Sequence, residues 1–156
     1  MTGSVEGIYI AAEAEGPARP VESARAVAGR GLEGDRYFAG DGTFYKEQKP
    51  GQDLTLIEAE AIEALAREDG IELGPGESRR NVVTRGIALN DLVGRRFTVG
   101  QVECVGQRLC DPCSHLERIT KPGVLEGLAN RGGLRADIVT GGEIAVGDVV
   151  VDQGAL

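Results

Sequence analysis

Two strand patterns and a cysteine cluster follow one another in a single stretch, Arg95-Arg-Phe-Thr-Val-Gly100-Gln-Val-Glu-Cys104-Val-Gly-Gln-Arg-Leu-Cys110-Asp-Pro-Cys113-Ser-His115-Leu116. Segments 95–99 and 101–108 carry the alternation of apolar and polar residues that is typical of half-buried strands. Segment 114–120 is expected to be a helix. Two of the three cysteines therefore lie between a strand and a helix, and the only histidine lies in the first turn of that helix. Thiols in this position are typical of metal, redox or nucleophilic chemistry.

Outside this stretch, further short strands are expected at 5–12, 21–28, 53–57, 134–140 and 148–151, and segment 79–86 is expected to be a basic entry to another strand. The clearest helix follows segment 53–57. Its expected start is a capping box at Thr55–Glu58, and Gly70 is expected to end it. Another short helix is expected at 122–130. The polar, glycine-rich segment 39–50 is expected to be a mobile loop.

Glycine is the compositional outlier, with 24 of the 156 residues, about twice the usual ~7%. So many glycines indicate many tight turns between short strands. Helices do not alternate with the strands, which argues against a parallel sheet of βαβ units. We therefore expect a mainly β fold with short helices (α+β), built as an irregular closed β-barrel. No internal boundary is evident, so residues 1–156 are expected to form a single domain.

The chain is acidic, with a formal net charge of −8 and a pI of about 4.7, and it lacks the basic footprint that nucleic-acid binding needs. The charge is uneven, however. Residues 1–78 carry 7 basic and 16 acidic side chains (−9), whereas residues 79–156 carry 10 and 9 (+1). Nine of those ten basic residues are arginines, which suit an anionic phosphate or carboxylate ligand. A solvated, unliganded face is the alternative for any single arginine.

Neither a signal peptide nor an apolar run of about 18 residues is visible. Three cysteines are an odd number, as expected of free thiols rather than a disulfide framework. We therefore expect a cytoplasmic protein without a membrane partner.

The cysteine cluster allows several interpretations. A zinc site needs four ligands, so it would require all three cysteines and His115. A dithiol redox pair of Cys110 and Cys113 has the right spacing, but the βαβ context typical of such pairs is missing. The pair could also be buried structural cysteines. Cys104 is expected in the core, and His115 is assigned no role.

A single working thiolate at Cys113 is the remaining interpretation. Either Asp111 caps the following helix with Pro112 as its first residue, or Ser114–Glu117 forms a capping box. Both arrangements place Cys113 beside unpaired backbone N–H groups, which should favour its thiolate form. A thiolate suits a soft metal or a sulfur-transfer step.

Several motifs in this order resemble those of the MOSC domain family, the C-terminal domains of molybdenum cofactor sulfurases, in the small stand-alone bacterial form. The resemblance runs from about Ala28 to Val151. The motifs are Gly31-Leu-Glu-Gly34-Asp35-Arg36, Arg79-Arg80-Asn81-Val82-Val83, Arg96-Phe97-Thr98-Val99-Gly100, Arg108-Leu-Cys110-Asp-Pro-Cys113 and Gly142-Glu-Ile-Ala-Val-Gly147-Asp148.

The resemblance implies a β-barrel that binds a molybdenum cofactor of the molybdopterin type. It implies that Cys113 is the molybdenum ligand or a sulfur (persulfide) carrier, and that Arg79, Asn81 and Asp111 line the cofactor pocket. Sulfur transfer, or reduction of N-oxygenated compounds, would be the activity. Pyridoxal phosphate is not expected in this chain and would belong to a partner cysteine desulfurase; a molybdoenzyme is the other expected partner. A dithiol redox protein and a non-catalytic module that holds the cofactor are the alternatives.

Overall fold

A computed structural model describes residues 2–13, 16–39, 50–74 and 76–156, so most of the loop expected at 39–50 lies outside the described residues. Within these ranges, eleven strands account for most of the regular structure, which confirms the mainly β prediction. The elements are β1 (Thr2–Ile10), β2 (Arg19–Val21), β3 (Ser23–Val27), β4 (Gly31–Leu32), α1 (Arg36–Ala39), β5 (Leu54–Glu58), α2 (Ala59–Asp69), β6 (Val82–Arg85), the 3₁₀ helix η1 (Leu89–Leu92), β7 (Arg95–Val99), β8 (Val102–Leu109), α3 (Ser114–Ile119), α4 (Val124–Gly127), β9 (Leu134–Thr140), β10 (Gly142–Ala145) and β11 (Val149–Ala155).

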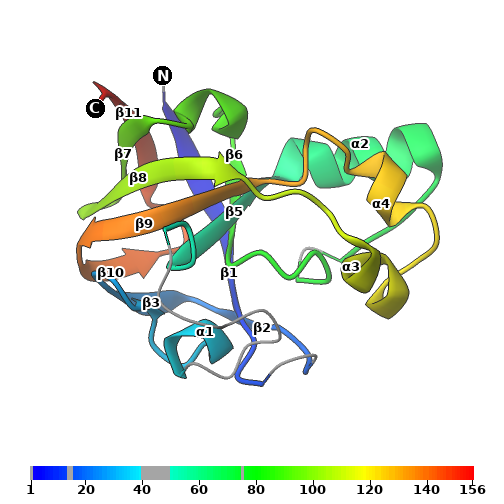
Figure 1. Cartoon of the computed structure of the whole chain (residues 1–156), viewed down its shortest axis with the longest axis horizontal. Coiled ribbons are helices and arrows are strands. Elements are labelled where there is room, and N and C mark those ends of the chain that lie inside the picture. Colours follow the sequence, from blue (N-terminus) through cyan, green and yellow to red (C-terminus); the bar gives the residue numbers. More distant parts are fainter. Residues whose placement is uncertain (1, 14–15, 40–49, 75) are drawn as a thin grey trace.

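Seven strands close into a barrel in the order β11-β7-β8-β9-β5-β6-β1, and β1 pairs back with β11 through Thr2 and Val151 (Figure 1). The β5–β6 pair is parallel and the other pairs in this ring are antiparallel. Strand β2 extends the sheet beside β1, and β10, β3 and β4 form a second, three-stranded sheet. The expectation of an irregular closed β-barrel is therefore confirmed.

Strand β7 has its predicted bounds, and β8 begins and ends one residue later than predicted. Strand β9 also has its predicted bounds. Strand β10 was not predicted from the sequence. It forms because segment 142–145 finds a partner 120 residues away in sequence, where Ile144 pairs with Ala24. Long-range pairing of this kind leaves no local signal.

Alternate side chains of the ring strands fill the barrel with an apolar core, whose largest member is Phe97, at 0% exposed. Cys104 lies opposite Phe97 on the paired strand and is 1% exposed. Burial, together with the nearby Asp53 carboxylate, raises the pKa of the Cys104 thiol to about 12. Cys104 is thus a core residue, as expected from its strand.

Helix α2 lies outside the barrel and begins at Ala59, after Glu58, which makes no side-chain capping hydrogen bond. The capping box expected at Thr55 is therefore wrong. Thr55 lies within β5, and its hydroxyl bonds Asn81 instead of a helix N–H. Gly70 ends the helix in the left-handed conformation (φ 67°), as predicted.

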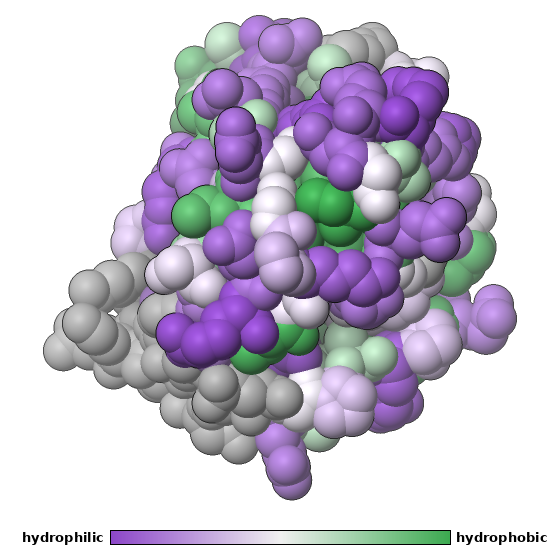
Figure 2. Space-filling view, turned by 90° about the vertical axis from the view of Figure 1, so that its right-hand side faces the viewer, coloured by the Kyte–Doolittle hydropathy of each residue, from purple (hydrophilic) through white to green (hydrophobic). Residues whose placement is uncertain are grey.

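Helices α2, α3 and α4 gather at one side of the barrel over a second apolar cluster that includes Leu65, Leu116 and Leu128 (Figure 1). Figure 2 shows this side of the molecule as mostly hydrophilic, with hydrophobic residues only in small separate patches. Among the described residues, no helix has the length and apolar character needed to cross a membrane. A hollow lies between helix α3 and the barrel strands β5 and β9.

Candidate functional site

A hollow of about 600 Å³, its solvent-open mouth included, opens where β5, β6 and β9 meet the turn between β8 and α3. All four residues predicted for the site, Arg79, Asn81, Asp111 and Cys113, line it. The two pairs are about thirty residues apart in sequence, and the fold brings them together. The full lining is Arg36, Thr55, Arg79, Arg80, Asn81, Cys110, Asp111, Cys113, His115, Leu116, Ile119 and Arg135.

The turn between β8 and α3, residues 110–113, sets the two cysteines at different depths. Both are free thiols, but Cys110 is 1% exposed whereas Cys113 is partly exposed and packs against the helical cluster. Cys113 is the N-cap residue of α3 and makes no side-chain capping bond. Its place at the helix start is as predicted, but neither predicted cap exists. Asp111 is too far upstream, and one Glu117 carboxylate oxygen accepts hydrogen bonds from the backbone N–H groups of Gly123 and Leu125 instead.

Two glycines before β9 hold this turn from one side. The Cys110 backbone N–H donates to the Gly133 carbonyl at 2.7 Å. A Cβ atom on Gly132 would lie 2.5 Å from the Cys110 carbonyl oxygen and 2.7 Å from the Pro112 ring, so only glycine allows this approach. The turn is therefore packed against backbone, which limits how far Cys110 can move.

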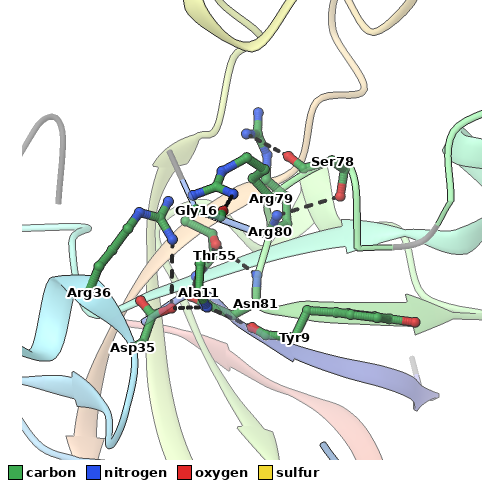
Figure 3. A network of polar contacts seen from close by, with 10 residues as sticks. All are labelled: Tyr9, Ala11, Gly16, Asp35, Arg36, Thr55, Ser78, Arg79, Arg80 and Asn81. Atoms are coloured by element: carbon green, nitrogen blue, oxygen red, sulfur yellow. Dashed lines mark hydrogen bonds and ion pairs between the residues drawn. The ribbon is translucent and has the colours of Figure 1, made fainter. Parts of the chain in front are cut away.

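Arg80 is a lining residue that was not among the predicted site residues. Its side chain is buried, and its guanidinium donates to the backbone carbonyls of Cys110 and Asp111 at 3.0 and 3.3 Å and of Gly132 at 2.8 Å. It also donates to the Ser78 carbonyl (Figure 3). In the sequence Arg80 is one of two adjacent arginines, and only their tertiary surroundings distinguish them.

Asn81 is 6% exposed and ties three strands together (Figure 3). Its side-chain oxygen accepts from the backbone N–H and the hydroxyl of Thr55, at 3.2 and 3.1 Å, and its Nδ2 donates to the Tyr9 carbonyl. The Asn81 backbone N–H donates to the Thr55 hydroxyl at 3.0 Å. The amide oxygen of Asn81 is thus committed to the fold, and its predicted contact with a cofactor stays a prediction.

Arg79 lies at the edge of the hollow and also lines an adjoining groove with Tyr9 and Ile119. Its guanidinium donates to the Gly16 carbonyl (Figure 3). The Arg79 backbone has φ 64°, in the left-handed region that residues other than glycine adopt only rarely. A bulky residue held in this conformation beside a cavity is a frequent feature of functional sites.

The hollow is positively charged, although the chain as a whole is acidic. Four arginines line it against one carboxylate, Asp111. Arg36 is fixed by its buried neighbour Asp35 at 3.6 Å, and Asp35 also accepts from the Ala11 N–H at 3.1 Å. The Arg135 guanidinium, by contrast, makes no hydrogen bond or ion pair with any residue that the structure describes. A phosphate or carboxylate group entering the hollow would therefore meet donors that suit it.

Side chains alone do not form a metal-ion cage here. Within ranges 2–13, 16–39, 50–74 and 76–156, no three His, Cys, Asp or Glu side chains converge in a way that could hold an ion. The zinc interpretation needed Cys104, which lies in the barrel core. His115 lines the hollow, and its Nδ1 lies 2.9 Å from an Arg118 guanidinium nitrogen, so Nδ1 is the acceptor.

Solved structures share this fold. The crystal structure of the YUAD protein from Bacillus subtilis matches with a TM-score of 0.80 at 18% identity, over 96% of this chain and 94% of that chain. YiiM from Escherichia coli matches with a TM-score of 0.72 at 16% identity, over 100% and 71%. YiiM from Geobacillus stearothermophilus matches with a TM-score of 0.67 at 14% identity, over 96% and 72%.

A search of curated protein sequences found no match. The family model described as MOSC domain matches residues 35–151, three quarters of the chain, and this range includes β5 to β10, the turn 110–113 and every residue that lines the hollow. The motifs that suggested the family therefore lie in the matched range, apart from the first four residues of Gly31–Arg36. The chain belongs to the MOSC domain family.

Proposed function

We propose that this protein binds a molybdenum cofactor of the molybdopterin type in the arginine-lined hollow, with Cys113 as molybdenum ligand or as sulfur carrier. One observation carries the proposal. Cys113 is the most accessible of the three thiols, and it lines a hollow that four arginines make positive.

The donor set fits such a cofactor. A thiolate is a soft ligand of the kind that binds molybdenum in preference to magnesium or calcium. Arginine forks suit the phosphate of a molybdopterin. When bound, such a cofactor would supply the redox or sulfur-transfer chemistry, and Cys113 would hold it.

The chain's own residues would hold and orient this group. Cys113 presents its thiol from the start of α3, and Arg135 offers a guanidinium that bonds no described residue. Asp35 fixes Arg36 on the opposite wall. Asn81 keeps β6 between β5 and β1, so the wall that Arg79 belongs to stays in place.

In the sulfur-carrier form of the proposal, Cys113 receives sulfur from a persulfide on a partner cysteine desulfurase. The Cys113 thiolate attacks the outer sulfur of that persulfide, and the sulfur–sulfur bond of the partner breaks. Cys113 then carries the persulfide and the partner recovers its thiolate, with no net oxidation. The acceptor would be the cofactor itself or a molybdoenzyme.

Molybdenum and pterin content of protein purified anaerobically, from cells that make the cofactor, tests the proposal. Cys113→Ser is expected to lose the metal or the persulfide while remaining folded, since its side chain is not in the barrel core. Cys110→Ala is the matched control and should retain molybdenum. Equal molybdenum in wild type and Cys113→Ser would overturn the assignment of Cys113 as ligand. If pterin still binds with nearly unchanged affinity, the protein is a cofactor-holding module instead.

A dithiol redox pair remains the alternative because Cys110 and Cys113 have its spacing. It requires both thiols to react, whereas Cys110 is 1% exposed. Thiol counts before and after mild oxidation distinguish the two. Loss of both thiols within one chain, without metal in any preparation, would favour the redox pair.

A further inference from the structure

We infer that Arg80 is a positioning residue that clamps the 110–113 turn, keeping the Cys110 thiol buried while leaving the Cys113 thiol open to the hollow. The arginine donates to the carbonyls of Cys110 and Asp111, the first two residues of this turn. The clamp matters for activity only if Cys113 is the working thiol, so its functional meaning rests on the proposed function.

The contacts of Arg80 join three segments that are far apart in sequence. Its Nε donates to the Gly132 carbonyl at 2.8 Å, before β9, and its Nη1 donates to the Ser78 carbonyl at 3.3 Å, before β6. Its Nη2 reaches the Cys110 and Asp111 carbonyls at 3.0 and 3.3 Å, after β8. A single side chain therefore supplies donors to carbonyls that the sheet leaves unpaired at this end of the barrel.

The chemistry of these contacts requires arginine rather than lysine. Arg80 is 8% exposed and has no carboxylate partner among the described residues, so four backbone carbonyls take the place of water around its charge. The planar fork can address carbonyls in several directions at once. The compact ammonium of a lysine has three donors on a shorter reach and would satisfy only some of them.

Glycine contacts on the other side of the turn make the clamp effective. The Gly132 carbonyl that Arg80 binds belongs to the same residue whose missing Cβ lets Cys110 and Pro112 approach. The Cys110 N–H is bound by Gly133, so both its N–H and its carbonyl are fixed. Cys113, three residues on, packs against the helical cluster, and its only backbone hydrogen bond among the described residues is the one its carbonyl accepts from the Glu117 N–H of α3. The difference in depth between the two thiols follows from this difference in anchoring.

Three cysteines in three surroundings, the barrel core, the clamped turn and the helix start, allow a direct test by maleimide labelling of the native protein, with each site counted by mass spectrometry after digestion. In wild type, Cys113 should react first, and Cys110 and Cys104 should stay protected. In Arg80→Met, Cys110 should react on the order of tenfold faster, because more than one charge-assisted hydrogen bond to the turn is lost. Cys104 should stay protected, since it belongs to the barrel core.

Two further variants complete the test. Arg80→Lys should give an intermediate Cys110 rate, because part of the clamp is rescued. Arg135→Met also removes one positive charge from the hollow but no hydrogen bond to the turn, so its Cys110 should label at the wild-type rate. A wild-type pattern in Arg80→Met would overturn the clamp, and so would simultaneous reaction of all three thiols, which would make Arg80 a general folding residue. The labelling experiment needs no bound cofactor. A negative result would therefore overturn the clamp without overturning the proposed function, and loss of the proposed function would leave the labelling result valid.

Discussion

The barrel and the hollow at its end are stabilised by different forces. The barrel core consists of apolar side chains such as Phe97, Leu134 and Val150, each 0% exposed, and Cys104 behaves there as one more small apolar residue. The walls of the hollow depend on directional hydrogen bonds. Arg80 donates to carbonyls on other segments, and the side-chain oxygens of Asn81 and Asp35 accept from N–H groups on other segments. The hydrophobic effect does not depend on the orientation of a side chain, whereas a hydrogen bond requires a defined distance and angle and so fixes the positions of its two groups.

This contrast explains why cysteines of one chain differ in role. Cys104 is surrounded by apolar side chains and its thiol has a raised pKa, so it stays neutral and unreactive. Cys110 and Cys113 lie where the chain leaves the barrel and polar contacts decide what is exposed. Substitutions in the two regions should therefore separate stability from the arrangement of the site.

The largest loss of stability is expected in the barrel. Phe97→Ala removes the largest fully buried side chain and leaves a cavity, and it should lower the free energy of unfolding by about 3–5 kcal/mol. Urea denaturation measures this. Native Cys113 labelling should be unchanged, because Phe97 does not line the hollow. Val139→Ala, at a side chain 54% exposed, should change stability by less than about 0.5 kcal/mol. A comparably small loss for Phe97→Ala would contradict the contrast.

A smaller loss, with a change in the site, is expected for Asn81→Ala. It strands the Thr55 N–H and hydroxyl and the Tyr9 carbonyl at a buried position, and it should cost about 1–3 kcal/mol. Cofactor affinity should fall with it as β6 loosens. Asn90→Ala removes an exposed hydrogen bond to the Asn130 carbonyl and serves as the control, with a loss near zero in the same denaturation assay. Affinity unaffected by Asn81→Ala would separate this residue from the site.

The smallest effect is expected at Glu58, where β5 leaves the barrel and α2 begins. Burial raises the pKa of the Glu58 carboxyl above the ordinary 4.5. The hydrogen bond from the Leu89 N–H lowers this pKa, and the nearby charges of Glu60 and Asp91 raise it, so the pKa remains raised overall. Because the folded state holds this proton more tightly than the unfolded state, the contribution to stability is full below about pH 4.5 and is lost as pH rises through the folded pKa.

Glu58→Gln keeps an oxygen for the Leu89 N–H and removes the charge. At pH 7 the free energy of unfolding of the variant should equal that of wild type or be higher by less than about 1 kcal/mol, because Glu58 is only partly buried. The difference should shrink as pH falls towards 4.5. Thermal unfolding measured across this range provides the comparison, and a variant that is clearly less stable at pH 7 would reverse the sign.

Much of the fold could be predicted from local patterns. Alternation in segments 95–99 and 134–140 placed β7 and β9 at their observed bounds, and Gly70 ended α2 as expected. The helix caps were predicted wrongly. Thr55 and Ser114 have the residue types of caps, but Thr55 is bonded to Asn81, and Glu117 is bonded to the start of α4. A polar side chain bonds to whatever the tertiary structure brings near it, and local sequence does not reveal that partner.

The class of fold, the family and four residues that line one hollow could be predicted from the sequence, because alternation, glycine spacing and the order of motifs are properties of the chain. Three features became visible only in the folded protein. Strand β1 closes the ring on β11, Arg80 rather than its neighbour binds the cysteine turn, and Cys110 is buried while Cys113 is partly exposed. These features depend on contacts between residues far apart in sequence, and a contact across thirty or more residues exists only once the chain has folded.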